Sequence, residues 1–282
     1  MNERLATVSV IVPTRNSART LEACLASIRR QDYNAIELIV VDNHSTDQTL
    51  QIASGNADVV DTFGPERSAQ RNRGAHLSHG EFLLFIDSDM TLAPQIVREC
   101  VDIVRTSGAP AVIIPEVSVG EGFWARCRAL ERSCYVGDDS IEAARFVSRT
   151  DFDTAGGYDE NLIAMEDWDL SIRIAAGRRL PRTLAFITHD EGRLRLGMVL
   201  SKKRYYASSG IAYWRKHGRP SLTQANLIFR PAYFRNWRRL ARHPVLTLGF
   251  FSLKSLEASA GAWGLFRKPR DSGLSNQHLG SR

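Results

Sequence analysis

Two aspartates, Asp87 and Asp89, follow the apolar run Phe82–Ile86 and are separated by one serine. The run predicts a buried strand, and residues two apart on extended backbone point to the same side. We therefore expect both carboxylates to leave the carboxyl end of a strand together. Two hard oxygen ligands there suit Mg²⁺ or Mn²⁺, which takes further ligands from water and a substrate diphosphate. The alternative for so short a motif is an acidic turn that closes a strand.

The elements that must position these carboxylates alternate between strand and helix patterns. Near-continuous apolar strands separated by helices predict an α/β fold, with a mostly parallel central sheet covered by helices on both faces. The expected strands are 7–12, 36–41, 57–60 and 82–86, and the expected helices are 18–30, a segment that begins after 45–47, 68–77 and 94–105. Beyond residue 115 we expect helices at 123–134, near 150 and at 166–176, a glycine turn at 156–157, and strands at 145–148 and 184–188.

Polar side chains follow several of the expected strands. Ligands on such sheets bind beyond the carboxyl ends of the strands, so these side chains should converge on one edge. Besides the two aspartates, the polar residues at strand ends are Thr14, Asp42 and His189.

Length and charge indicate one domain with an appendage. The 282 residues are 43% hydrophobic, enough for a full core. Residues 1–192 carry 19 Lys and Arg against 29 Asp and Glu, whereas residues 193–282 carry 18 against 2. We therefore expect a catalytic domain at 1–192 and a basic, mainly helical region at 193–282 that contacts an anionic surface.

The cysteines and the N-terminus predict a reduced, cytoplasmic setting. The four cysteines have no C-x-x-C spacing, so neither a zinc site nor a disulfide framework is indicated. The residues before Val8 are too few for the apolar core of a signal peptide.

Five motifs stand in order along the chain, at 10–16, 40–47, 69–74, 87–89 and 166–170. Together, and at this spacing, they resemble the inverting glycosyltransferases of family 2, which have the GT-A fold. The resemblance covers roughly residues 7–192. The sequence differs from the common family pattern at 14–15 and 43–44, so it assigns no nucleobase.

The resemblance implies a role for each matching residue on the donor side. Pro13, Thr14 and Asp42 would line the nucleobase pocket, and Arg71 would flank the base or the diphosphate. Asp87 would meet the ribose or the metal shell. The residue types fit, because carboxylates accept hydrogen bonds from ribose hydroxyls and a cation offsets a leaving diphosphate.

The resemblance also implies the metal ligand and the general base. Asp89 would bind Mg²⁺ or Mn²⁺ directly, and His189 either completes that shell or packs behind it. An inverting transfer needs one base for the acceptor hydroxyl proton, and by resemblance that base is Asp167. Glu166 would orient the site or contact the acceptor, although two carboxylates at a helix N-terminus also serve dipole compensation.

These residues together predict a metal-dependent inverting glycosyltransferase of the hexosyltransferase type. It would move a sugar from a nucleoside diphosphate to a hydroxyl on a lipid-linked, glycan or small-molecule acceptor. A sugar nucleotidyltransferase is one alternative, but no glycine-rich basic loop follows the first strand. A non-catalytic membrane adaptor with a sugar-nucleotide fold is the other.

The basic region interleaves cations with aromatic residues. On a continuous helix Phe234, Trp237 and Leu240 would share one face, opposite a set of arginines, which is typical of a helix in a membrane interface. We therefore expect peripheral binding at the anionic inner face of the membrane, with docking on the catalytic domain as the alternative and no nucleic-acid partner. The stretch 244–266 is too interrupted by Lys254 and Glu257 for a confident membrane span.

Overall fold

A computed structural model describes residues 5–218 and 230–266. The chain divides into two compact units, one comprising Met1–Val117 and Val136–Asp190, the other Ser118–Tyr135 and Glu191–Arg282. Compared with the domains expected from the sequence, residues 118–135 lie with the basic region rather than with the sheet. Their helix packs against the last helix of the chain, as described below.

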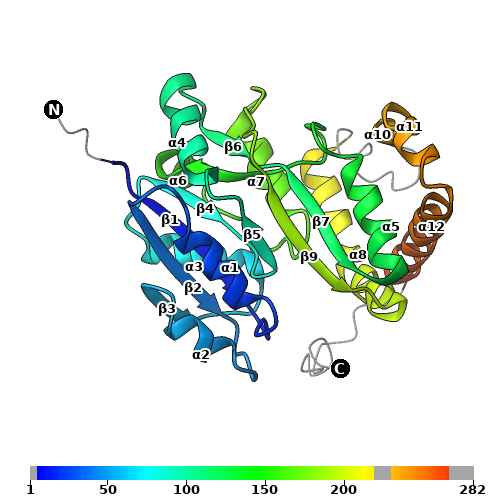
Figure 1. The fold of residues 1–282 in the computed structure, drawn as a ribbon, viewed down its shortest axis with the longest axis horizontal. Helices are drawn as coiled ribbons and strands as arrows, with labels where there is room; N and C mark the ends of the chain where they lie inside the picture. The colour runs from blue at the N-terminus through cyan, green and yellow to red at the C-terminus, as the bar shows by residue number, and fades with distance from the viewer. Residues whose placement is uncertain (1–4, 219–229, 267–282) are drawn as a thin grey trace. The chain divides into compact units, whose positions relative to one another are not determined.

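The first unit is built on a six-stranded sheet in the order β3-β2-β1-β4-β8-β6 (Figure 1). Pairing is parallel from β3 through β4, and antiparallel for β8 with both β4 and β6. The α/β fold with a mostly parallel sheet is therefore confirmed. The strands are β1 Val8–Thr14, β2 Ile36–Asp42, β3 Val59–Thr62, β4 Phe82–Phe85, β6 Ala111–Ile113 and β8 Ala144–Ser148.

Helices bury both faces of this sheet, as the apolar strands require. Val8, Val10 and Val12 of β1 point into one core, whereas Ile11 points into the other. The first core is covered by α1 Leu21–Arg29, α2 Thr49–Ser54 and α4 Ile96–Ser107, and the second by α3 Arg67–Leu77, α6 Arg149–Thr154 and α7 Glu166–Ala175.

The described residues contain three further strands, β5, β7 and β9. β5 (Met90–Leu92) pairs antiparallel with β9 (Ile187–Arg193), and the third strand is β7 (Glu116–Glu121). The sequence predicted the last strand at 184–188, but Leu184 is 89% exposed and its backbone N–H donates to Glu99. His189 therefore lies inside β9 rather than after it.

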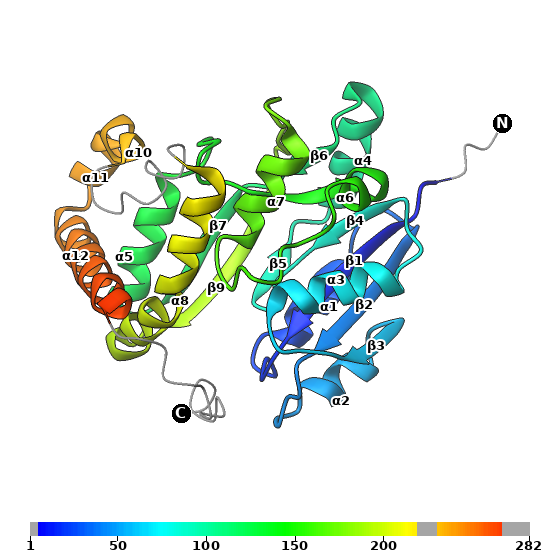
Figure 2. The same cartoon turned by 180° about the vertical axis from the view of Figure 1, so that it is seen from behind.

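The second unit is mainly helical (Figure 2). Its helix α12 packs along α5 and α8, and glycines allow the close approach, because a Cβ at Gly249 would meet Phe123 and Cys127 at 2.5–2.6 Å. No helix in the described ranges is long and apolar enough to cross a membrane. The helices are α5 Gly122–Ser133, α8 Leu196–His217, α10 Pro231–Arg235, α11 Trp237–Ala241 and α12 Pro244–Phe266.

The predicted membrane helix is interrupted. The chain bends at Asn236, so α10 and α11 are separate helices of five residues each. Phe234 and Trp237 are exposed, as expected, but Leu240 is buried. The prediction of one continuous face with all three residues is therefore wrong, because the break at Asn236 changes the helical phase between them.

Candidate active site

The aspartate motif after β4 forms a turn rather than an extended segment. The backbone N–H of Met90 donates to the carbonyl of Asp87 at 3.0 Å, which is the hydrogen bond of a four-residue turn. The extended backbone predicted for the motif is therefore wrong, and the two carboxylates meet different partners. Asp87 faces buried arginines, and Asp89 faces His189.

Arg71 joins two of the predicted site residues. It extends from α3, is only 2% exposed, and donates to Asp87 Oδ1 at 2.6 Å and to Glu166 Oε1 at 3.0 Å. Its guanidinium also lies over the ring of Tyr158, at 5.1 Å from the centroid. Arg71 is therefore no surface helix arginine. It connects the end of β4 with the start of α7, so Asp87 and Glu166, 79 positions apart, belong to one cluster.

A second buried arginine, Arg145 of β8, completes the cluster around Asp87. It lies 3.5 Å from Asp87 Oδ2 and 2.6 Å from Glu116 Oε1. Burial alone would raise the pKa of Asp87, but Arg71 and Arg145 hold that pKa far below its ordinary value. Asp87 therefore stays ionised at any pH at which the protein would work.

Asp89 and His189 form the other half of the strand-end site. Met90 and His189 are register partners in the β5–β9 ladder, which brings His189 Nε2 to 3.3 Å from Asp89 Oδ2. The carboxylate of Asp89 is 41% exposed, whereas the imidazole is mostly buried. A carboxylate and an imidazole nitrogen that open to solvent on one side are a donor pair that Mn²⁺ or Mg²⁺ accepts, with water and diphosphate oxygens as the remaining ligands.

The structure does not bring the three predicted metal ligands, Asp87, Asp89 and His189, together as one cluster. Within residues 5–218 and 230–266, no three His, Cys, Asp or Glu side chains lie close enough together to hold one metal ion. The carboxylate of Asp87 pairs instead with Arg71 and Arg145. The donor pair that fits a metal is Asp89 with His189.

The two carboxylates at the start of α7, Glu166 and Asp167, lie in different electrostatic surroundings. Glu166 is 3% exposed and accepts from Arg71, with Arg67 Nη2 at 3.6 Å. Burial and the neighbouring charge of Glu166 raise the pKa of Asp167, although Arg145 and Arg71 oppose them. A carboxylate with a raised pKa is a better proton acceptor near neutral pH, as a general base requires.

The backbone before this pair is strained. Met165 has φ 66°, the left-handed conformation that residues with a Cβ avoid at a cost of about 1–2 kcal/mol. Asp169 of the same helix turns inward and pairs with Arg173 at 2.6 Å, and Arg173 donates to the carbonyl of Gly157. These contacts fix the start of α7 against the glycine turn.

The loops after β1 and β2 are tied together by Asp42. Its buried carboxylate accepts from Thr14 Oγ1 at 2.8 Å and from the Ser45 backbone N–H at 2.7 Å. Gln70 of α3 donates to the Thr14 carbonyl at 2.9 Å, and Pro13 is buried beside it. The structure therefore brings these three predicted residues together, and their contact with a nucleobase stays a prediction.

Sequence reasoning missed Arg145, Glu116 and Arg67. Arg145 gave a signal, because it is a cation at the start of the short expected strand 145–148, directly before Phe146 and Val147. Glu116 and Arg67 have neighbours that only the folded chain brings close, so no local pattern marks either residue.

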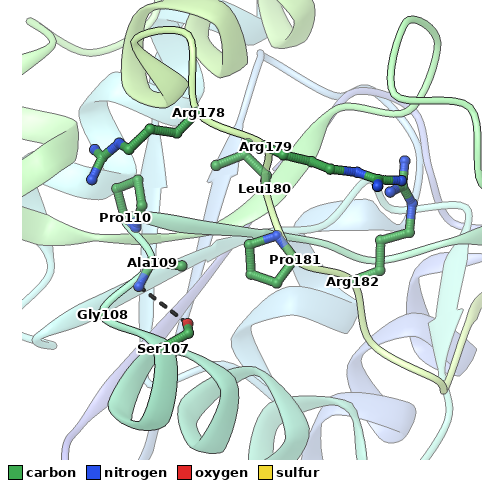
Figure 3. A pocket seen from close by; sticks show the side chains of 9 residues that line it. All are labelled: Ser107, Gly108, Ala109, Pro110, Arg178, Arg179, Leu180, Pro181 and Arg182. Atoms are coloured by element: carbon green, nitrogen blue, oxygen red, sulfur yellow. Dashed lines mark hydrogen bonds between the residues drawn. The ribbon is translucent and has the colours of Figure 1, made fainter.

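A cavity of about 470 Å³ lies elsewhere in the first unit, between the end of α4 and the segment after α7 (Figure 3). Arg179 and Arg182 on its wall extend the same way because both pair with Asp139, at 3.0 and 2.5 Å. Those arginine charges are offset by carboxylates, and none of the predicted site residues lines this cavity. It adds nothing to the site.

Comparisons with known proteins show the family of the chain. Residues 9–158 match the profile of the family described as "Glycosyl transferase family 2". The chain belongs to this family. A PGL/p-HBAD biosynthesis glycosyltransferase of Mycobacterium bovis is 34% identical over 176 residues, which cover 58% of this chain and 68% of that protein. The chain is therefore a glycosyltransferase.

Solved structures show the same fold. The mannosyltransferase PcManGT from Pyrobaculum calidifontis has a TM-score of 0.65 at 18% identity, with 94% of this chain and 88% of that chain covered. S. aureus TarS residues 1–349 have a TM-score of 0.56 at 18% identity, with 94% and 93% covered. The GT-A fold expected from the sequence is confirmed.

The first prediction concerns Arg145, which contacts both Asp87 and Glu116. Arg145→Gln should lower the free energy of unfolding by about 3–5 kcal/mol, because it leaves the mostly buried carboxylate of Glu116 without its arginine and leaves Asp87 with Arg71 alone. Arg98→Gln is the matched control: its pair with Asp32 is exposed, so the loss should stay within about 1 kcal/mol. Urea denaturation measures both. Equal losses in the two variants would show that Arg145 is not the cation holding these carboxylates.

Proposed function

We propose that this glycosyltransferase is metal-dependent and inverts the configuration at the anomeric carbon of a nucleoside diphosphate sugar. The observation that carries the proposal is Arg71, which contacts both Asp87 and Glu166. One buried arginine thus joins the strand-end aspartates, where a diphosphate and a metal would lie, to the helix start that carries the candidate base. A donor and an acceptor hydroxyl need these two regions side by side.

We assign the metal-facing side to Asp89 and His189, and the ribose to Asp87. The bound cation would neutralise charge on the leaving diphosphate. Arg67, which is 42% exposed and one helical turn before the buried Arg71, is the arginine that a diphosphate can reach from solvent. Pro13, Thr14 and Asp42 remain our proposal for the nucleobase. The complex of PcManGT with GDP-Man and Mn²⁺ supports a metal and a sugar nucleotide here.

The proposed reaction uses Asp167 as the base. The oxygen of an acceptor hydroxyl forms a new bond to the anomeric carbon while the bond from that carbon to the diphosphate breaks. The electron pair of the broken bond leaves with the diphosphate, and the hydroxyl proton passes to the carboxylate of Asp167. Glu166, which Arg71 and Arg67 hold, orients the start of α7 and leaves Asp167 as the proton acceptor.

We further propose that the acceptor is met at an anionic membrane surface, the cytoplasmic face. The support is the basic region, in which 18 cations stand against two carboxylates. The acceptor would then be lipid-linked, or a glycan or small molecule at that surface.

Release of nucleoside diphosphate from sugar nucleotides, measured with Mn²⁺ and with a chelator, tests the proposal. We expect release only with metal, and a product of opposite anomeric configuration to the donor by NMR. Retained configuration would contradict inversion. Metal-dependent nucleotide binding without any donor consumption would favour the non-catalytic adaptor, and pyrophosphate release from a nucleoside triphosphate and a sugar 1-phosphate would favour a nucleotidyltransferase.

A further inference from the structure

Helix α12 turns its two charged side chains inward. Lys254 and Glu257, which interrupt its sequence, are 3% and 0% exposed. Lys254 Nζ lies 2.6 Å from Glu131 of α5 and 2.7 Å from Glu257, and Arg128 of α5 pairs with Glu257. These charges are balanced inside the helical unit, so they contribute nothing to the outer surface of α12.

The outward face of α12 has no charge over its described side chains. Four large apolar residues on it are 41–71% exposed, and serines fill the positions between them. Each serine hydroxyl donates to the backbone carbonyl four residues earlier, at 2.9–3.0 Å. Such back-bonding satisfies the hydroxyls without water. The apolar residues are Val245, Leu248, Leu256 and Trp263, and the serines are Ser252, Ser255 and Ser259.

Cations and two aromatic residues adjoin the start of this face. Phe234 and Trp237 are 67% and 59% exposed in α10 and α11. Between Arg193 and Phe266 the sequence has one carboxylate, the buried Glu257, so nothing acidic in that stretch faces outward. The exposed arginines here are Arg235, Arg238, Arg239 and Arg242.

We propose that the outer face of α12, together with Phe234 and Trp237, lies in the interface of an anionic lipid bilayer, parallel to its plane. The proposal rests on the membrane partner of the proposed function and names the surface that meets it. The inner face of α12 packs on α5 and α8, so only the outer face can enter lipid. The arginines can pair with anionic lipid headgroups, and the uncharged face can lie at the boundary of the acyl chains below them.

A second copy of this chain fits the surface less well. Two-fold pairing of this face would bring the arginines of both copies near one another, and like charges across an interface oppose association. No exposed carboxylate of α10, α11 or α12 could offset them.

Flotation of the full-length protein with vesicles tests the proposal. We compare phosphatidylcholine alone with phosphatidylcholine mixed with phosphatidylglycerol, across a salt series. Binding to the anionic vesicles should weaken as salt screens the arginines, over a Debye length of about 8 Å at physiological ionic strength, and should leave a salt-resistant remainder from the apolar face.

Leu248→Asn with Trp263→Asn should reduce the salt-resistant remainder about tenfold or more, since two exposed apolar side chains no longer enter lipid. Leu184→Asn is the control, because Leu184 is 89% exposed in the other unit and should change nothing. Thermal unfolding of each variant checks that the fold is kept.

Three results would overturn the proposal: flotation unchanged in the double variant, equal flotation with neutral vesicles, or a dimer in light scattering that the double variant abolishes. Nucleotide-induced thermal shifts measured on the same samples separate the two proposals. A thermal shift without flotation would contradict only the proposed membrane surface. Flotation without a thermal shift would contradict only the proposed function.

Discussion

Asp89→Ala should abolish glycosyl transfer and remove the metal dependence of nucleotide binding. Asp89 is the exposed carboxylate of the pair with His189, and the arginines keep Asp87 from replacing it. The imidazole alone would not hold a cation that dehydrates reluctantly. Calorimetric titration of the nucleotide with and without Mn²⁺ measures this effect.

Asp32→Ala serves as the control for Asp89→Ala, since Asp32 is an exposed carboxylate that pairs with Arg98. It should leave both transfer and metal dependence unchanged. If Asp89→Ala kept its metal-dependent nucleotide affinity, the metal would have to lie elsewhere.

Asp167→Asn should lower turnover by about 10²–10⁴ while nucleotide affinity stays near wild type, because it removes the proton acceptor and keeps the shape. Burial and Glu166 raise the pKa of Asp167, so wild-type turnover should fall as pH falls through that raised value. Turnover and its pH profile, measured under saturating donor, check both. Turnover within a few-fold of wild type would place the base elsewhere.

The same variant should change stability in the opposite direction. Because the folded-state pKa of Asp167 is raised, ionising this carboxyl lowers the free energy of unfolding as pH rises through the folded value. Asp167→Asn removes the ionisable carboxyl and therefore this pH-dependent loss of stability. Its melting temperature should therefore exceed that of wild type near neutral pH, and the difference should vanish below the ordinary pKa of an aspartate. A lower melting temperature at neutral pH would contradict the raised pKa.

The sequence predicted the parts of the fold that repeat a strong pattern. The strands β1, β2 and β4 are unbroken apolar runs, and α1 keeps its apolar residues on one face, so periodicity was sufficient to locate them. It missed β5 and β6, because three residues carry no period, and it also missed the six-residue strand β7. The break at Asn236 was missed for a similar reason, since no glycine or proline marks it.

Which candidate residues lie near one another was easier to predict from the sequence than which contacts each of them makes. Thr14 and Asp42 lie together as the strand ends implied, whereas Asp89 meets His189 through the β5–β9 ladder. The turn at Asp87 and the arginine bridges depend on neighbours distant in sequence, which no local pattern records. The inward turn of Lys254 and Glu257 depends likewise on partners in α5.

Thermal unfolding in the presence of nucleoside diphosphates, with Mn²⁺ or with a chelator, tests the central claim of a metal-dependent sugar-nucleotide site most directly. A ligand at about 100 times its Kd stabilises a protein by roughly 2.7 kcal/mol, which is several degrees for a domain of this size. We expect at least one nucleoside diphosphate to raise the melting temperature with Mn²⁺ and to lose that effect in the chelator. No shift with any nucleoside diphosphate, or the same shift without metal, would contradict the account.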